Sequence, residues 1–248
     1  MNTLGIDIGG SGIKGAVVNT ETGEFIQERF RLPTPEKAEP GDVAKTVKQL
    51  VDHFRWKGAV GAGFPAVVLH GVTYTAANVH PSWIGTNAED LFHKETSLPV
   101  YVLNDADAAG VAEMAFGAGR GQKGTVLMLT IGTGIGSAIF VDGVLLPNTE
   151  FGHIKIRGKD AEWRSSDAVR QQKKWSWKQW SKRLEEHIQY LEALIWPDLI
   201  IVGGGVSKKY DKFFPYLKLR AKLLPAQLLN EAGIVGAAIY ASQQESKK

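Results

Sequence analysis

Two polar residues, Asn104 and Asp105, directly follow a short apolar run and are of types that bind polar ligands. The run Val100–Leu103 contains β-favouring residues and predicts a buried strand, and residues 106–116 predict a helix. In open α/β sheets, ligands bind at the carboxyl ends of strands, which is where these two side chains would lie. The alternative is that one of them only caps the helix, accepting a bond from a free N–H of its first turn.

A glycine-rich turn near the N-terminus predicts an anion site. Its residues are Gly9, Gly10, Ser11 and Gly12. Strand-like runs at 4–8 and 13–18 flank it, so the turn is neither a Rossmann fingerprint nor a Walker loop, which a helix would follow. Glycine allows successive N–H groups to converge on a phosphate oxygen. Asp7 could then hold a hydrated Mg²⁺ and Lys14 could reach the phosphate, although a plain tight hairpin is the alternative.

A second glycine turn of the same kind lies about half a chain further on. Residues 125–130 predict a strand, 131–136 a turn and 137–141 a second strand. An internal repeat of this kind decides the fold. The sequence therefore predicts two similar α/β domains that face a cleft, each offering a backbone site for phosphate.

Other patterns place the elements between these motifs. Residues 24–31 favour a third strand beside the first hairpin, and the spacing over 42–54 predicts a helix with Asp42 as its N-cap. Residues 59–65 predict a further strand. A helix is expected around 89–93, after a long loop whose length is itself a weak sign of function.

A basic segment extends over residues 155–222, with 16 Lys and Arg against 8 Asp and Glu. Its net +8 leaves −5 for the rest of the chain, since the total is +3. Within it, the pattern over 176–195 predicts an amphipathic helix that Ser176 and Gln179 begin with a capping box. The segment suggests a localised anion site, and a solvated helix face is the alternative. The cluster near the helix start is Lys173, Lys174, Lys178, Lys182 and Arg183.

Composition excludes several classes of protein. The chain has 248 residues, of which 44% are hydrophobic and 22% charged, as in ordinary globular proteins. It has no cysteine, which excludes disulfides and thiolate metal sites. There is no signal-peptide pattern and no run approaching ~18 apolar residues, so we expect a cytoplasmic protein with no membrane partner.

Four ordered motifs resemble those of the sugar kinase–actin–Hsp70 superfamily and, within it, the ROK family of sugar kinases and repressors. They are Asp7-Ile-Gly-Gly, Leu103-Asn-Asp-Ala, Thr130-Ile-Gly-Thr-Gly-Ile-Gly and Glu150-Phe-Gly-His153. Segments 196–209, 225–228 and 232–238 resemble a narrower group, the polyphosphate glucokinases and polyphosphate glucomannokinases. The resemblance covers essentially the whole chain.

This resemblance implies a duplicated actin-like ATPase fold with two α/β domains and a cleft between them. We expect the domains at residues 1–112 and 113–233, with the last helix, 234–248, packing back on the first. The implied reaction is phosphoryl transfer from inorganic polyphosphate to the 6-hydroxyl of glucose.

The resemblance also implies roles for individual residues. Asp105 would be the catalytic base, and Asp7 would hold Mg²⁺ through water. The implied sugar ligands are Asn104, Asp105, Glu150, His153, Glu162 and Asn78. The implied donor ligands are Asp7, Gly9, Gly10, Ser11, Gly12, Lys14, Thr130, Gly132, Thr133, Gly134, Gly204, Gly205 and Lys208. The zinc-binding Cys/His motif of the family is missing here, so we expect no zinc site and a sugar-binding His153.

Three alternatives stay open at this point. The first is an ATP-dependent kinase of another hexose or of an N-acetylhexosamine. The second is a sugar-sensing regulator, disfavoured because the first hairpin begins at Leu4 and leaves no room for a DNA-binding helix pair, so we expect no nucleic-acid partner. The third is an actin-like structural protein, in which Glu150 and His153 would have no role. The sequence leaves mannose as a substrate, ATP as a donor, polyphosphate length and a homodimer undecided.

Overall fold

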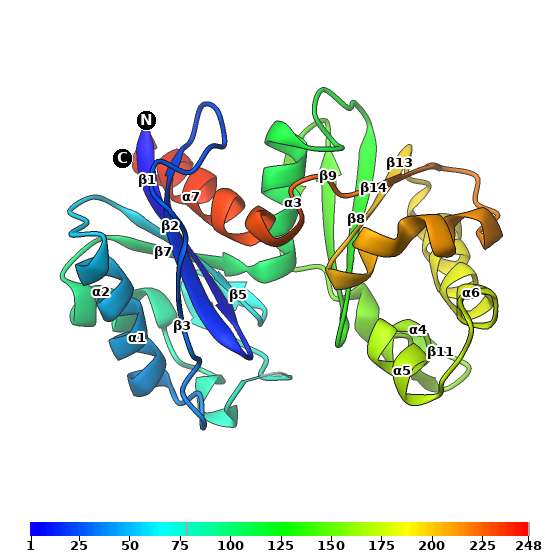
Figure 1. The fold of residues 1–248 in the computed structure, drawn as a ribbon, viewed down its shortest axis with the longest axis horizontal. Coiled ribbons are helices and arrows are strands. Elements are labelled where there is room, and N and C mark those ends of the chain that lie inside the picture. Colours follow the sequence, from blue (N-terminus) through cyan, green and yellow to red (C-terminus); the bar gives the residue numbers. More distant parts are fainter. Residues whose placement is uncertain (78, 248) are drawn as a thin grey trace. The chain divides into compact units, whose positions relative to one another are not determined.

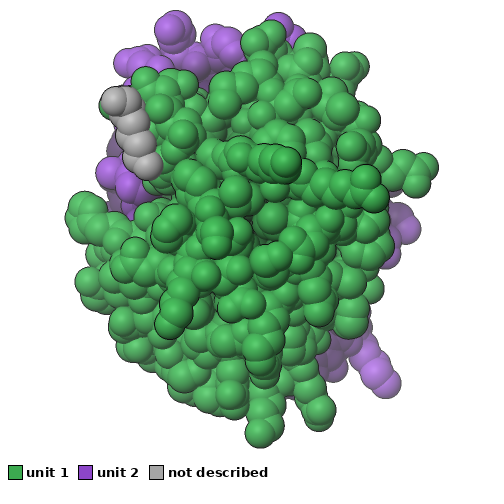
Figure 2. All heavy atoms as spheres, turned by 90° about the vertical axis from the view of Figure 1, so that its left-hand side faces the viewer, with its two compact units in different colours: residues 1–112, 231–248 green, residues 113–230 purple. Residues whose placement is uncertain are grey.

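Two sheets of five strands, each with its own helices, organise the described parts of the chain, residues 1–77 and 79–247 of a computed structural model (Figure 1). The chain divides into two compact units. The first comprises Met1–Ala112 with Glu231–Lys248, and the second comprises Glu113–Asn230. Figure 2 shows the atoms of the first in green and those of the second in purple.

The sheet of the first unit has the strand order β3-β2-β1-β4-β7. Its strands are β1 (Asn2–Gly9), β2 (Gly12–Asn19), β3 (Phe30–Leu32), β4 (Val60–Phe64) and β7 (Val100–Asn104), and a small separate hairpin is formed by β5 (Val68–Leu69) and β6 (Val72–Thr73). The helices are α1 (Pro40–His53), η1 (Pro81–Trp83), α2 (Ala88–Thr96), α3 (Asp105–Phe116), η5 (Leu229–Glu231) and α7 (Ala232–Glu245). Helix α3 begins in this unit and ends in the second, and η5 begins in the second unit and ends in this one.

Alternation along β1 determines what each face of this sheet contacts. Leu4, Ile6 and Ile8 are buried in one cluster with the apolar faces of α1 and α2. The residues between them face α7, which lies on the other side of the sheet in Figure 1. A Cβ on Gly5 or on its β4 neighbour Gly61 would overlap backbone oxygens of α7, so these glycines allow the helix to lie directly on the strands.

Parallel pairing brings the carboxyl ends of three strands to one edge of the sheet. Strand β1 is parallel to β4, and β4 is parallel to β7. In the register, Asp7 lies beside Gly63, and Gly63 lies beside Leu103. The segment that follows β7 therefore leaves the sheet close to the end of β1.

Two expectations about the first unit were wrong. Helix α1 begins at Pro40 after Glu39, so Asp42 is not its N-cap but an acidic residue of its first turn; proline suits the first helical position because its missing N–H would be unpaired there. The third strand is β3, which pairs with Ile13–Gly15 and so includes only the last two residues of the expected strand, whereas residues 24–29 contribute only a single bridge at Phe25.

The sheet of the second unit has the order β10-β9-β8-β13-β14. Its strands are β8 (Thr125–Ile131), β9 (Ile135–Val141), β10 (Val144–Leu146), β13 (Leu199–Gly203) and β14 (Lys222–Pro225), with a small pair, β11 (Lys155–Ile156) and β12 (Lys159–Asp160). The helices are η2 (Phe151–His153), α4 (Glu162–Ser165), α5 (Asp167–Gln172), α6 (Trp177–Ile195), η3 (Gly205–Lys212) and η4 (Phe214–Tyr216).

This second sheet repeats the plan of the first: three antiparallel strands followed by two parallel ones. The predicted helix over 176–195 is confirmed as α6, including its capping box. Its buried residues Trp180, Leu184 and Ile188 pack on the apolar residues of β8 and β13. The prediction of an α/β fold with a repeated glycine hairpin is therefore confirmed. In the described residues, no helix has the length and apolar character needed to cross a membrane.

Candidate active site

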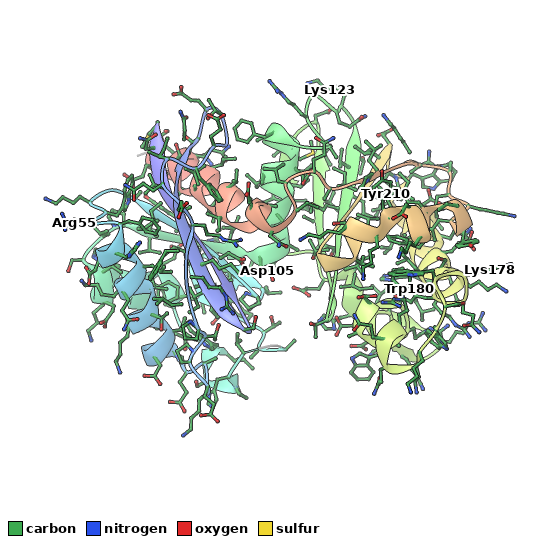
Figure 3. All side chains as sticks on the ribbon, viewed as in Figure 1. Arg55, Asp105, Lys123, Lys178, Trp180 and Tyr210 are labelled. Carbon is green, nitrogen blue, oxygen red and sulfur yellow. The ribbon has the colours of Figure 1, made fainter. Side chains whose placement is uncertain are left out.

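Asp105 is the first residue of α3, at the point where β7 ends (Figure 3). Its side chain is half-buried, and one carboxylate oxygen accepts a bond from the N–H of Ala106 at 2.8 Å. The register of the parallel strands places it near the same edge of the sheet as Asp7, which lies in the last part of β1. The expected position of this carboxylate, at the carboxyl end of a strand, is what the structure has.

Asn104 is the N-cap of α3, which was the alternative stated for this pair of residues. Its Oδ1 accepts bonds from the N–H groups of Ala106 and Asp107 at 2.8 and 3.2 Å. Its Nδ2 donates to the carbonyl of Ala66 at 3.1 Å. The side chain is buried, so its amide is fixed in orientation, and the second Nδ2 hydrogen is the group left to meet a ligand.

Asp7 lies in a positively biased environment. Lys14, its partner across the β1–β2 ladder, has its Nζ 3.3 Å from the carboxylate. On the other side the carboxylate faces Gly233 in the first turn of α7, where unpaired N–H groups and the helix dipole favour negative charge. A single partly exposed carboxylate suits Mg²⁺, which retains most of its water. Within the described residues, no group of three or more His, Cys, Asp or Glu side chains could hold a metal directly.

The turn of the β1–β2 hairpin is held from outside by side chains near β3. Arg31 donates to the carbonyl of Ser11 and Thr34 donates to that of Gly9, both at 2.5 Å. None of the glycines of this turn has a left-handed backbone, so backbone conformation alone does not require them. They provide space instead: a Cβ on Gly12 would overlap the Arg31 guanidinium, and one on Gly10 would meet no atom within 4 Å.

A cavity of about 280 Å³ opens beside this turn, within the first unit. Gly9, Gly10, Thr34, Lys37 and His80 are among the residues that line it. The hollow therefore combines backbone groups of the turn with the residues Glu36 and Lys37, of opposite charge, and an imidazole.

In the second unit, three carboxylates lie around the imidazole of His153 and form a cluster of four polar side chains with it. His153 Nδ1 lies 3.1 Å from Asp160 and 3.9 Å from Glu162, and its Nε2 lies 3.7 Å from Glu150. The predicted residues Glu150, His153 and Glu162 are thus brought together. Asp160 joins them, and sequence reasoning had missed it because no motif contains it.

The electrostatics of this cluster differ from one carboxylate to the next. Burial raises the pKa of Glu150 above its usual value, opposed by the nearby His153 and reinforced by the charge of Glu162. Hydrogen bonds from Lys155 and then His153 lower the pKa of Asp160. Asp160 is therefore the carboxylate that orients the imidazole. Glu150 is the carboxylate whose raised pKa an added hydrogen-bond donor would lower most.

The second hairpin turn contacts this cluster directly. Glu162 accepts a bond from the N–H of Ile135 at 3.1 Å, immediately after the turn. A Cβ on Gly134 would come within 2.5 Å of the same carboxylate, whereas one on Gly132 would meet nothing within 4 Å. Thr133 is exposed between them, and Thr130 is half-buried at the end of β8.

The third glycine turn follows β13. Gly203 lies beside Thr130 in the ladder, and Gly204 has a φ of 75°, with its Cα against the backbone of Ile131. This left-handed conformation explains the glycine there. Gly205 and Lys208 are exposed, at the start and on the surface of η3.

Part of the basic segment is neutralised internally. Arg157 and Arg164 both bind Glu186, and Arg170 binds Asp167. The exposed lysines around the start of α6 form none of the ion pairs found among the described residues. These lysines are Lys173, Lys174, Lys178 and Lys182. Figure 3 shows Lys178 pointing outward from the helix.

Asn78, predicted as a sugar ligand, lies outside the described residues. Besides Asp160, sequence reasoning missed Arg31 and His187, which contact site segments far away in the chain. Their partners are backbone carbonyls, which leave no trace in residue type, so only the fold reveals them.

Comparisons with known proteins agree with this arrangement. Residues 3–163 match the ROK family. The chain is 51% identical over 237 residues to the polyphosphate glucokinase of Mycobacterium tuberculosis (strain CDC 1551 / Oshkosh), covering 95% of this chain and 89% of that protein.

Two solved structures are also similar. The inorganic polyphosphate/ATP-glucomannokinase of Arthrobacter sp. strain KM has a TM-score of 0.93 and 47% identity, covering 98% of this chain and 99% of that one. A ROK family glucokinase from Streptomyces griseus, solved with glucose and AMPPNP, has a TM-score of 0.83 and 26% identity over 98% of this chain and 100% of that one. The repeated sheet, the two glycine hairpins and the match over residues 3–163 lead to one conclusion: this chain belongs to the ROK family.

Proposed function

We propose that this chain transfers a phosphoryl group from inorganic polyphosphate to the 6-hydroxyl of glucose, giving glucose 6-phosphate. The observation that carries the proposal is the 51% identity to a polyphosphate glucokinase over 95% of the chain. The residues that such a reaction requires are present, and their surroundings suit the roles that follow.

Asp105 is the proton acceptor in this proposal. A sugar hydroxyl attacks phosphorus more readily as its proton leaves, and a carboxylate within hydrogen-bond distance can accept that proton. Asp105 fits because its backbone is fixed by a helix start while its side chain stays partly exposed. The fixed amide of Asn104 would donate a hydrogen bond to a neighbouring sugar oxygen.

Glu150, His153 and Glu162 bind the ring hydroxyls in this proposal. Carboxylates accept from hydroxyl groups, and an imidazole can donate or accept. Asp160 binds Nδ1 of His153 and so leaves Nε2 directed toward Glu150 and the ligand. The arrangement suits a ligand with several hydroxyl groups, since two carboxylate acceptors and an imidazole lie close together.

The two hairpin turns bind the donor phosphates. Lys14 and the turn beside Gly10 supply a cation and open space in the first unit. Thr130 and Thr133 supply hydroxyls in the second. When bound at Asp7, Mg²⁺ would neutralise charge that develops on the transferred phosphoryl group.

The exposed lysines between α5 and α6 and on α6 would hold the remote part of a long donor. Polyphosphate carries a charge on every unit, so a row of unpaired cations retains it without requiring a fixed geometry. Lys208 on η3 would extend that row. Here the helix start and the lysines favour anions together.

A wider substrate range is a second candidate. The 47% identical Arthrobacter protein is described as a polyphosphate/ATP-glucomannokinase. ATP as an additional donor and mannose as an additional acceptor are therefore included in the test. The homodimer stays a prediction, which light scattering of the purified protein would decide.

The test is to measure sugar phosphate formation with Mg²⁺, using long-chain polyphosphate and ATP separately as donors and glucose and mannose as acceptors. We expect strong turnover with polyphosphate and glucose. No turnover with any donor and sugar would contradict the proposal. Turnover with ATP alone would retain the kinase and remove the role given to the lysines.

The base is tested by Asp105→Asn, which keeps the acceptor for the Ala106 N–H and removes the charge. We expect kcat to fall about 100- to 10,000-fold, as for other lost proton acceptors, with glucose binding retained by calorimetry. Asp42→Asn, an exposed carboxylate of α1, is the control. Normal turnover in Asp105→Asn would rule out the base.

A further inference from the structure

His187 lies on the buried face of α6 and is 1% exposed. Both of its ring nitrogens have partners. Nε2 is 3.1 Å from the carbonyl oxygen of Phe151, and Nδ1 is 3.0 Å from the hydroxyl of Ser165. A buried imidazole bound at both nitrogens is fixed in position and orientation.

The two partners belong to the two segments that carry the acidic cluster. Phe151 follows Glu150 directly in the short helix that ends at His153. Ser165 is the last residue of α4, which begins at Glu162. One ring on α6 therefore joins the segment of Glu150 and His153 to the segment of Glu162.

The chemistry of the partners fixes the state of this ring. A carbonyl oxygen can only accept, so Nε2 carries the proton. Burial lowers the pKa of His187 to about 4, so the ring is neutral and Nδ1 accepts. The Ser165 hydroxyl then donates either to Nδ1 or to the carbonyl of Ala161 at 2.8 Å. A neutral histidine supplies the donor and the acceptor that this position requires.

A second residue of α6 supports the same segment. Trp180, two turns before His187, donates from its indole N–H to the carbonyls of Ser165 and Ser166. Glu162, at the other end of α4, accepts from Ile135 after the hairpin turn. Helix α4 is therefore held at both ends, and His187 is its connection to Phe151.

We propose that His187 is a positioning residue that sets the spacing between the Glu150–His153 segment and helix α4, and through it the affinity for the sugar. The inference rests on the proposed function, because it needs Glu150, His153 and Glu162 to bind the sugar. Its signature is selective: the KM for glucose should change, while the KM for polyphosphate should not.

A matched pair of serine variants tests this without changing the histidine. Ser165 and Ser181 are both fully buried, and the hydroxyl oxygen of each lies 2.8 Å from the carbonyl oxygen four residues earlier. Of the two, Ser165 is the one that contacts His187. We expect Ser165→Ala to raise the KM for glucose about three- to tenfold, the range of one hydrogen bond, and Ser181→Ala to leave it within twofold of wild type.

Two histidine variants separate the two bonds. In His187→Gln, the amide nitrogen reaches about as far as Nε2 and can still donate to Phe151. In His187→Asn, the shorter side chain reaches only as far as Nδ1. We expect the glutamine variant, which loses the Ser165 contact, to raise the glucose KM about as much as Ser165→Ala does, and the asparagine variant, which loses the Phe151 bond, to raise it about tenfold or more. If neither histidine variant folds, the comparison of Ser165→Ala with Ser181→Ala still tests the positioning role of His187.

The outcomes distinguish the inference from the function on which it rests. Wild-type protein that fails to phosphorylate glucose overturns both. With an active wild type, equal glucose KM values in Ser165→Ala and Ser181→Ala would overturn the positioning role alone. A parallel rise in the KM values for glucose and polyphosphate would also overturn it, because that is the mark of a general disturbance of the active site and not of the sugar-binding side chains alone.

Discussion

The two glycine hairpins have the same ladder but carry different charges. At the end of β1, Asp7 lies opposite Lys14, whereas at the end of β8, Thr130 lies opposite Gly136. In both hairpins a pair of isoleucines follows, and then the turn. The duplication has kept the apolar residues that hold each hairpin in its sheet, and it has placed the charged pair in one unit only.

The two turns are also braced differently. In the first, a cation and a hydroxyl from near β3 bind turn carbonyls. In the second, the Glu162 carboxylate accepts the N–H of Ile135, and Gly132 accepts a bond from Ala168 of α5. The first turn is therefore suited to charge on a donor, and the second is connected to the side chains proposed to bind the sugar.

Among changes to the two hairpins, the largest effect should come from removing the charge that only the first hairpin has. Asp7→Asn keeps the size of the side chain but loses the carboxylate proposed to hold Mg²⁺. We expect kcat/KM to fall about 100- to 1,000-fold, the range for a lost electrostatic contact to a reacting group. Initial rates over a series of Mg²⁺ concentrations would measure it. The equivalent change in the second hairpin, Thr130→Val, should cost about tenfold or less; equal losses would contradict the division of roles.

The second unit should be the more sensitive to acid. His187 is buried there, while the first unit buries no histidine among its described residues. The pKa of His187 is lowered by burial to about 4 from the usual 6.5, so the unfolded chain binds the proton more tightly between these values. The contribution of His187 to the free energy of unfolding is therefore complete above pH 6.5. It decreases as the pH falls toward 4, by up to about 3 kcal/mol.

Urea unfolding at pH 7.5 and pH 4.5, followed by tryptophan fluorescence, would measure this loss. Five of the seven tryptophans lie in residues 113–230, so the signal reports mainly on the second unit. In His187→Gln the dependence on pH should be flatter, because the buried titrating group is gone. His93→Gln, an exposed position of α2, is the control. If the free energy of unfolding falls as much between pH 7.5 and pH 4.5 in His187→Gln as in wild type, another titrating group causes the effect.

Local patterns predicted the elements but not the contacts between them. Both hairpins and α6 could be read from the sequence because glycine turns, alternation and the Ser176–Gln179 capping box lie within a few residues of each other. The N-cap at Asp42 was wrong because Pro40 starts α1 earlier. The strand over 24–31 was wrong because pairing with β2 begins only at Phe30.

The site could be predicted where side chains form a motif. Glu150, His153 and Glu162 were expected together, and the structure places each of the two glutamates within 4 Å of the His153 ring. Asp160, Arg31 and His187 were not expected. Asp160 bonds to His153 after a β-turn, and the other two bind backbone carbonyls 20 and 36 residues away. A carbonyl is common to every residue, so no residue pattern identifies it as a partner.

The connection between the second turn and Glu162 can be broken by one methyl group. A Cβ at Gly134 would lie 2.5 Å from Oε2 of Glu162, and one at Gly132 would meet nothing within 4 Å. We expect Gly134→Ala to displace the carboxylate, which is the far end of a flexible side chain and can shift at little cost in stability, and to raise the KM for glucose roughly tenfold. Gly132→Ala should leave that KM unchanged. Steady-state kinetics with glucose varied would compare the two, and equal KM values would show that Glu162 does not need its present position.

The smallest effect should come from the brace of the first turn. Arg31 is exposed, and its guanidinium donates to the Ser11 carbonyl and covers Gly12. No ion pair among the described residues neutralises it, so its charge is available to a donor phosphate beside the turn. An exposed charge contributes about 0.2–1 kcal/mol. We expect Arg31→Ala to raise the KM for polyphosphate about two- to fivefold and to leave the KM for glucose unchanged. The difference from wild type should disappear at high salt, where exposed charges are screened.

The KM for polyphosphate of Arg31→Lys should lie between those of wild type and Arg31→Ala, since lysine keeps the charge without the planar donor. Arg29→Ala, two residues earlier and also exposed, is the control. If Arg29→Ala and Arg31→Ala behave alike, the effect belongs to net charge, and the brace has no part in holding the donor.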